Sequence, residues 1–177
     1  MNKVNVNYQE PLAYYEIASF IKDYIDINTI IICVGTDKCI GDSLGPIVGS
    51  MLKENGIPLA IYGTLDNPIH ALNLSDKIDI ITKNNIGNLI GIDACIGDIE
   101  SIGNIQARDY PLHPGKGVGK SLPDIGETSI IGIVDGGDDF TIFTNRNIRL
   151  SLVVNMAKVI TKAIIEAYNI KIKKIKS

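Results

Sequence analysis

The sequence has 177 residues, of which 45% are hydrophobic and 21% charged, and its formal net charge is −3. These values are typical of one globular domain with its own core and exclude a disordered chain. The acidic balance argues against a nucleic-acid-binding protein, and no apolar run approaches the roughly 18 residues that a membrane-spanning helix needs. The N-terminus lacks the basic-then-apolar pattern of a signal peptide, so we expect a soluble, cytoplasmic protein.

Helix and strand patterns alternate along the first part of the chain. Residues 1–8 are polar and are expected to form a loose end. Apolar residues at spacings of three and four predict an amphipathic helix over 10–25. Residues 29–34 form a run of β-branched residues that is typical of a central parallel strand. A helix over 44–54, which ends at a Gly-Ile-Pro stop, and a short strand over 59–62 follow.

The same alternation continues to the C-terminus and predicts a three-layer α/β/α sandwich with a mainly parallel sheet. The whole chain, 1–177, is expected to be a single domain without an internal repeat. Residues 170–177 are expected to be a flexible end whose lysines form a solvated helix terminus rather than a binding patch. The further predicted elements are helices over 69–72, 75–83 and 147–168, strands over 88–94, 102–109 and 128–134, and a long irregular segment over 110–126.

Two carboxylates lie where predicted strands end. Asp42 follows the first central strand on a strand-to-helix loop, and such loops carry the ligand sites of open α/β sheets. Asp93 interrupts an otherwise apolar strand, and burying an unpaired carboxylate costs several kcal/mol. Each acid also has a purely structural interpretation. Asp42 could cap the next helix, and Asp93 could accept hydrogen bonds from the backbone of the following turn.

The two acids together indicate a hydrolytic site. Neighbouring strands lie about 5 Å apart, so carboxylates at adjacent strand ends would share a proton or hold a cation. Either arrangement can hydrolyse an amide, because one acid activates water while the other donates a proton, or a metal polarises the carbonyl. We therefore predict Asp42 and Asp93 as the catalytic residues. A divalent metal ion is the one cofactor that this chemistry leaves open.

Histidines and cysteines add weaker candidates. His113, in the long irregular segment, could join the two acids as a third metal ligand, although a single loop histidine is more often a surface residue. His70 is a weaker alternative at a predicted helix start. The three cysteines have no CxxC spacing, so neither a disulfide framework nor a zinc knuckle is indicated. Cys33 is expected in the core, and the roles of Cys39 and Cys95, near the acids, stay open.

A glycine- and lysine-rich run over 115–121 invites comparison with a phosphate-binding loop. It lacks the GxxxxGK[ST] spacing and does not connect a strand directly to a long helix. An acidic pocket would also repel phosphate. A nucleotide-binding domain is therefore the third-ranked interpretation.

Three segments carry a resemblance to a known family: GTDKCIGDSLGP over 35–46, NLIGIDA over 88–94 and HPGKGVG over 113–119. They resemble the YyaC-type sporulation proteins, which are relatives of the spore germination protease and, more distantly, of the hydrogenase maturation proteases. The resemblance covers residues 30–167 and implies a phosphorylase/hydrolase-like fold with peptidase chemistry. Asp42 and Asp93 match the two aspartates of these proteases, and His113 aligns with the histidine ligand of the hydrogenase enzymes.

The resemblance implies a peptidase of the sporulating cell or spore interior, with small acid-soluble spore proteins as substrates by analogy. The germination protease is much longer and self-processes from a zymogen, through segments that are absent here. The competing hypothesis is a non-enzymatic sporulation protein that keeps the acidic pocket to bind a metal or a partner. Neither hypothesis involves nucleic acid or a membrane, and the sequence leaves the oligomeric state open.

Overall fold

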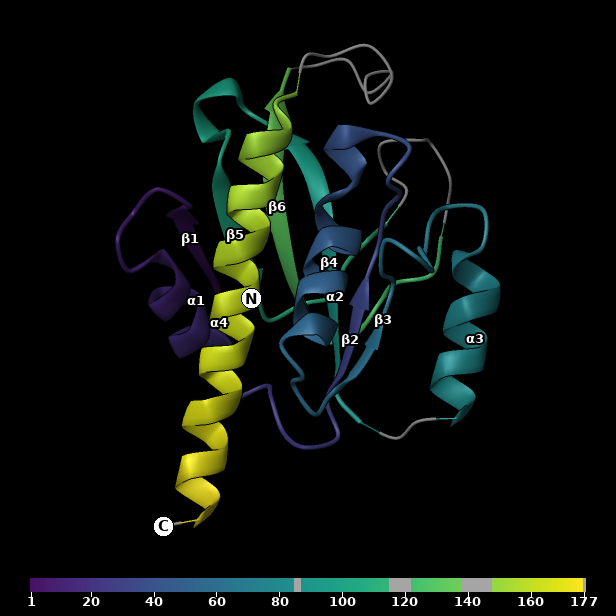
Figure 1. Ribbon diagram of the computed structural model, residues 1–177, viewed down its shortest axis with the longest axis vertical. Helices are drawn as coiled ribbons and strands as arrows, with labels where there is room; N and C mark the ends of the chain where they lie inside the picture. The colour runs from purple at the N-terminus through teal and green to yellow at the C-terminus, as the bar shows by residue number, and fades with distance from the viewer. Residues whose placement is uncertain (85–86, 115–121, 138–147, 177) are drawn as a thin grey trace.

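The computed structural model describes residues 1–84, 87–114, 122–137 and 148–176. A six-stranded sheet in the order β1-β5-β6-β4-β2-β3 runs through its centre (Figure 1). The pairings among β6, β4, β2 and β3 are parallel, whereas β1 and β5 join the sheet antiparallel. The prediction of an α/β domain with a mainly parallel sheet is confirmed. The strands are β1 (Lys3–Asn7), β2 (Ile30–Cys33), β3 (Ala60–Tyr62), β4 (Leu89–Gly97), β5 (Asn104–Arg108) and β6 (Thr128–Gly136).

Helices cover both faces of the sheet, as predicted. Side chains of α1 (Ala13–Ile21), α2 (Leu44–Glu54) and α4 (Leu150–Lys176) pack on one face, and those of α3 (Leu74–Asn84) pack on the other (Figure 1). Alternate residues of β2 enter the two cores because successive strand side chains point to opposite faces. Ile31 and Cys33 join the core under α1, α2 and α4, and Ile30 and Ile32 join the core under α3. No helix within the described ranges is long and apolar enough to span a bilayer.

Glycines bring α2 directly onto the ends of the parallel strands. A Cβ atom at Gly45 would overlap the carbonyl oxygen of Val34, and one at Gly49 would overlap the carbonyl oxygen of Gly63. Gly35 leaves β2 at a φ of 133°, where a side chain would strike the backbone of Asp42. The loop after β2 therefore folds back tightly on itself, and this fixes where Asp42 lies.

The chain differs from the sequence prediction at several places. The strand predicted over 88–94 continues to Gly97, so Asp93 lies within β4 and not at its end. Residues 1–8, expected to be loose, contain β1, which pairs with β5. Just before β1 begins, the Asn2 N–H donates to the Asp109 carboxylate at 2.7 Å. Residues 69–72, predicted as a short helix, form an isolated bridge from Ile69 to Val34 and then a turn. The final helix continues beyond its predicted end at residue 168, as far as Lys176.

Candidate functional site at the ends of the parallel strands

Asp42 ends a single turn of 3-10 helix, η1 (Ile40–Asp42), between β2 and α2. Its backbone carbonyl accepts the Thr36 N–H at 2.9 Å, and its own N–H donates to the Cys39 carbonyl at 3.0 Å. Ser43, not Asp42, occupies the N-cap position of α2, and no side chain caps that helix. The helix-cap interpretation of Asp42 is therefore wrong, and its half-buried carboxyl group needs another explanation.

Asp93 lies on β4, level with the point where β2 ends. The Val34 N–H donates to the Ile92 carbonyl at 2.7 Å, and Asp93 pairs with Ile131 of β6. By strand alternation its side chain is on the face that α3 covers, together with Cys95. One carboxylate oxygen accepts the N–H of Ala94 at 2.8 Å. The structural interpretation of Asp93 thus accounts for a single hydrogen bond, which leaves acceptor capacity for other groups.

The two carboxyl groups influence each other electrostatically. Burial raises the pKa of Asp93 well above its usual range, and the negative charge of Asp42 raises it further, against a lowering by the Ala94 N–H and Arg108. Burial raises the pKa of Asp42 to about 6, against a hydrogen bond from the Thr36 backbone. Raised pKa values of two coupled carboxyl groups favour a state in which one group is ionised while the other keeps its proton. This is the division of roles that a general base and a general acid require.

Cys33 and Cys95 do not supply a nucleophile. Burial raises the pKa of Cys95 to about 11, and the charge of Asp93 adds to this rise while Arg108 opposes it. Cys33 is fully buried in the core, and burial raises the pKa of its thiol still further. Both thiols stay protonated at neutral pH and are poor nucleophiles. Cys39 lies half-buried in the loop before η1.

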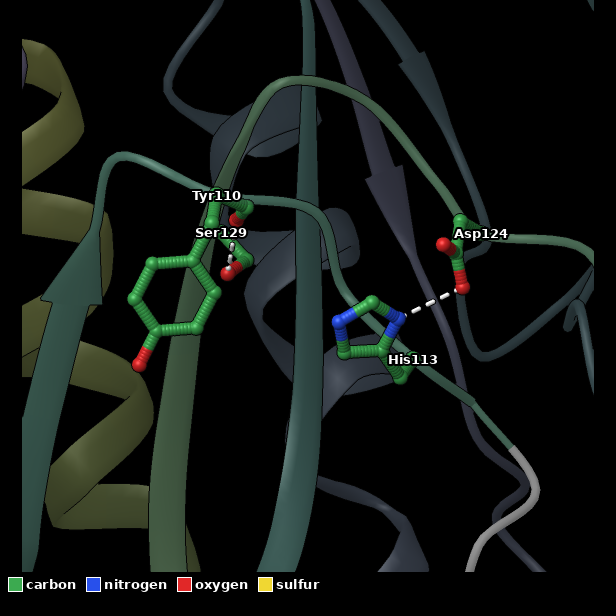
Figure 2. A network of polar contacts seen from close by, with 4 residues as sticks. All are labelled: Tyr110, His113, Asp124 and Ser129. Atoms are coloured by element: carbon green, nitrogen blue, oxygen red, sulfur yellow. Dashed lines mark hydrogen bonds and ion pairs between the residues drawn. The ribbon is translucent and has the colours of Figure 1, made fainter. Parts of the chain in front are cut away.

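His113 lies on the segment between β5 and β6. Leu112 and Ile125 form an antiparallel bridge with reciprocal hydrogen bonds of 3.0 and 2.9 Å, which brings two arms of this segment together. Beside the bridge, His113 Nδ1 lies 2.5 Å from Asp124 Oδ1 (Figure 2). A Cβ atom at Gly91 of β4 would lie 2.8 Å from Leu112 Cβ, so this segment covers the strand directly beside Asp93.

The proposed third ligand does not complete a metal site in the described geometry. His113 pairs with Asp124, which the sequence interpretation did not include. In the part of the chain that the structure describes, no three His, Cys, Asp or Glu side chains are grouped to hold a metal ion. The described geometry therefore does not group Asp42, Asp93 and His113 around one metal ion, and we derive no chemical step through a metal.

The sequence also singled out His70 and the run over 115–121. His70 Nδ1 accepts the Leu72 N–H at 3.3 Å in the turn before α3, which is a structural role. The glycine- and lysine-rich run over 115–121 lies outside the described residues.

Sequence reasoning missed a cation beside the site. Arg108, the last residue of β5, donates from Nε to Ser129 Oγ at 3.1 Å, and its guanidinium lies 4.8 Å from the centre of the Tyr110 ring. Ser129 Oγ in turn donates to the Tyr110 carbonyl at 2.8 Å (Figure 2). The sequence signal for this contact was a polar serine, Ser129, within the apolar run of β6. The partner of that serine could not be predicted, because it depends on the register of the sheet.

Comparison with known proteins gives two matches. A family model described as "Protein of unknown function (DUF1256)" matches residues 5–163, a range that contains both acids, Arg108 and His113. The chain is 44% identical over 137 residues to "Uncharacterized protein YyaC" of Bacillus subtilis (strain 168), which covers 76% of this chain and 67% of that protein. The YyaC-type resemblance is thereby confirmed at the level of the family, and the chain belongs to the DUF1256 family.

Proposed function

We propose that this protein is a peptide hydrolase of the sporulating cell in which Asp42 and Asp93 form the catalytic pair. The observation that carries the proposal is the electrostatic coupling of two half-buried acids, Asp42 in the loop after β2 and Asp93 within the neighbouring strand β4. Burial raises the pKa of Asp42 to about 6, and burial together with the charge of Asp42 raises the pKa of Asp93 well above its usual range. Carboxyl pairs whose environments separate their pKa values commonly divide the base and acid roles. The sporulation setting rests on the resemblance to YyaC-type proteins, and small acid-soluble spore proteins are the proposed substrates.

Hydrolysis by the pair needs only water and the substrate. Water attacks the peptide carbonyl carbon, Asp42 takes a proton from that water, and Asp93 donates its proton to the carbonyl oxygen. The tetrahedral intermediate then loses its C–N bond as Asp42 returns a proton to the leaving amine. Asp93 regains its proton as the new carboxyl group forms. Both aspartates finish as they began, so the cycle is balanced.

The segment that carries Leu112, His113 and Ile125 is the proposed border of the substrate site. It covers β4 at Gly91, two positions before Asp93 on the same face of the strand. Its His113–Asp124 pair lies on the exposed part of the segment, with 41% and 57% of the two side chains accessible. We therefore expect His113 to affect substrate binding more than the chemical step.

The proposal is tested by incubating the purified protein with small acid-soluble spore proteins in ¹⁸O-labelled water. We expect cleavage products that carry ¹⁸O in their new C-terminal carboxylates. A chelator should leave the rate unchanged, and His113→Ala should change kcat less than about tenfold.

Two other outcomes would redirect the proposal. Activity lost to the chelator and to His113→Ala, and restored by added metal, would show a metal hydrolase and contradict the proton-sharing pair. Absence of any cleavage, with melting that depends on metal and requires both acids, would instead support the non-enzymatic binding protein.

A further inference from the structure

Arg108 carries a positive charge close to the aspartate pair but has no part in the hydrolytic steps above. Its charge acts on both Asp93 and Cys95, whose pKa values it lowers against their burial. Arg108 and Ser129 are register partners on β5 and β6, and Ser129 is in turn the register partner of Gly91 on β4. The cation is thus on β5, which β6 separates from β4, at one edge of the site.

The guanidinium of Arg108 is held in place before any ligand arrives. Its Nε–H donates to Ser129 Oγ at 3.1 Å, and Ser129 Oγ is itself fixed by donation to the Tyr110 carbonyl at 2.8 Å. The Tyr110 ring lies 4.8 Å from the guanidinium carbon, within the range of a cation–π contact. These contacts on Nε and on one face of the plane fix the orientation of the guanidinium, so little entropy is lost when it binds a partner.

The two terminal nitrogens of Arg108 have no recorded partner among the described residues. The only ion pair recorded within those ranges joins His113 to Asp124, and Asp93 directs one oxygen to its neighbouring Ala94 N–H instead. A half-buried guanidinium without a carboxylate pays a desolvation cost that a bidentate partner would offset. The group that best fits two parallel N–H donors is a carboxylate.

We propose that Arg108 is a specificity residue that binds a carboxylate of the peptide substrate and so holds the peptide beside Asp42 and Asp93. The proposal rests on the peptidase function proposed above and narrows its substrate class to peptides with a carboxylate near the cleaved bond. That carboxylate is either an acidic side chain or a free C-terminus. Both present the same two oxygens to the guanidinium.

The test measures binding without turnover, in the Asp93→Asn protein. Three peptides serve as probes: acetyl-Ala-Leu-Glu-Leu-Ala-amide, the same peptide with Gln in place of Glu, and the Gln peptide with a free C-terminal carboxylate. The sequence contains three arginines, so ¹⁵N-arginine labelling gives a spectrum with few Nε–Hε signals. Arg108→Lys assigns the Arg108 signal.

We expect a carboxylate peptide to shift the Arg108 signal and to bind about 10- to 100-fold more tightly than the Gln amide, the range for a hydrogen bond to a charged group. The Glu amide and the free acid show which source of carboxylate is used. Arg108→Gln should abolish the preference. The matched control Arg149→Gln, at an exposed arginine just before α4, should keep it.

Equal binding of all three peptides, or equal weakening of all three by Arg108→Gln, would overturn the inference. Lack of binding by every peptide would overturn it as well. This binding test and the cleavage test of the proposed function can fail independently of each other. A carboxylate preference that depends on Arg108, in a protein that cleaves no peptide, would support the inference about binding and contradict the proposed peptidase.

Discussion

Asp93→Asn is expected to lower kcat/KM for peptide cleavage by about 10²- to 10⁴-fold. An asparagine has the shape of the protonated aspartic acid but cannot release a proton to the carbonyl oxygen, and a general acid contributes roughly 10²- to 10⁴-fold to a rate. The measurement is the initial rate of cleavage of the same spore protein by the wild type and the variant at neutral pH. An activity within tenfold of the wild type would contradict a catalytic role for Asp93.

The control for this variant is its thermal stability across pH. A raised pKa means that the folded state holds the proton of Asp93 more tightly than the unfolded chain does. The resulting stability is complete below the unfolded pKa of about 4 and is lost as the pH rises through the folded value. The substituted asparagine side chain never ionises, so the variant should melt at or above the wild-type temperature in alkaline buffer. Activity lost together with stability would point to unfolding instead.

Gly63→Ala is expected to destabilise the fold by more than about 3 kcal/mol. Gly63 follows β3 at a φ of 84°, and a Cβ atom there would overlap the backbone carbonyl of Cys33 in β2. The neighbouring strand cannot yield without disturbing α2, because the Gly63 carbonyl itself lies against Gly49 of that helix. Urea unfolding of the wild type and the variant measures the loss.

Gly56→Ala is the matched control for this prediction. Gly56 also has a positive φ, of 65°, but a Cβ atom there would have nothing within 4 Å. The cost should therefore be about 1 kcal/mol, which is the backbone term alone. Equal losses of unfolding free energy in the two variants would show that the close approach of Gly63 to the β2 backbone does not determine the cost of a side chain at that position.

The proximity of Asp42 and Asp93 could be predicted from the sequence because β2 and β4 are adjacent parallel strands. The prediction that Asp93 lies at a strand end is wrong, because β4 continues to Gly97. A charged residue inside the apolar segment NLIGIDA is also a strong local signal. The boundaries of α2 were predicted at 44–54 and are observed there, since its start after Ser43 and its Gly-Ile-Pro end are both local features. Local signals of this kind were sufficient for α2 and for the proximity of Asp42 and Asp93, whose catalytic role stays a prediction.

Arg108 could not be assigned to the site from the sequence, because its position depends on strand direction. β5 joins β6 antiparallel, and only that register places Arg108 opposite Ser129. The alternation of Val4 and Val6 was the available signal for β1, but a five-residue edge strand with one buried side chain resembles a polar tail. The direction of a strand and its place at the edge depend on the whole sheet, so the local sequence of that strand does not predict them.

The partner of His113 could not be predicted from the sequence either. The sequence singled out the residue and suggested the two acids as its partners. Its observed partner, Asp124, lies eleven residues further along the chain and is brought close by the Leu112–Ile125 bridge. That bridge exists because both side chains pack over the bare backbone of Gly91, which is a tertiary contact.

The proton-sharing pair is tested most directly by the titration of its two carboxyl groups, which needs no substrate. The ¹³Cγ shifts of Asp42 and Asp93, followed by NMR against pH, should give a midpoint near pH 6 for Asp42 and a higher one for Asp93. Asp42→Asn should lower the midpoint of Asp93, because it removes the neighbouring charge. Independent midpoints near the ordinary aspartate value of about 4 for both groups would contradict the catalytic pair.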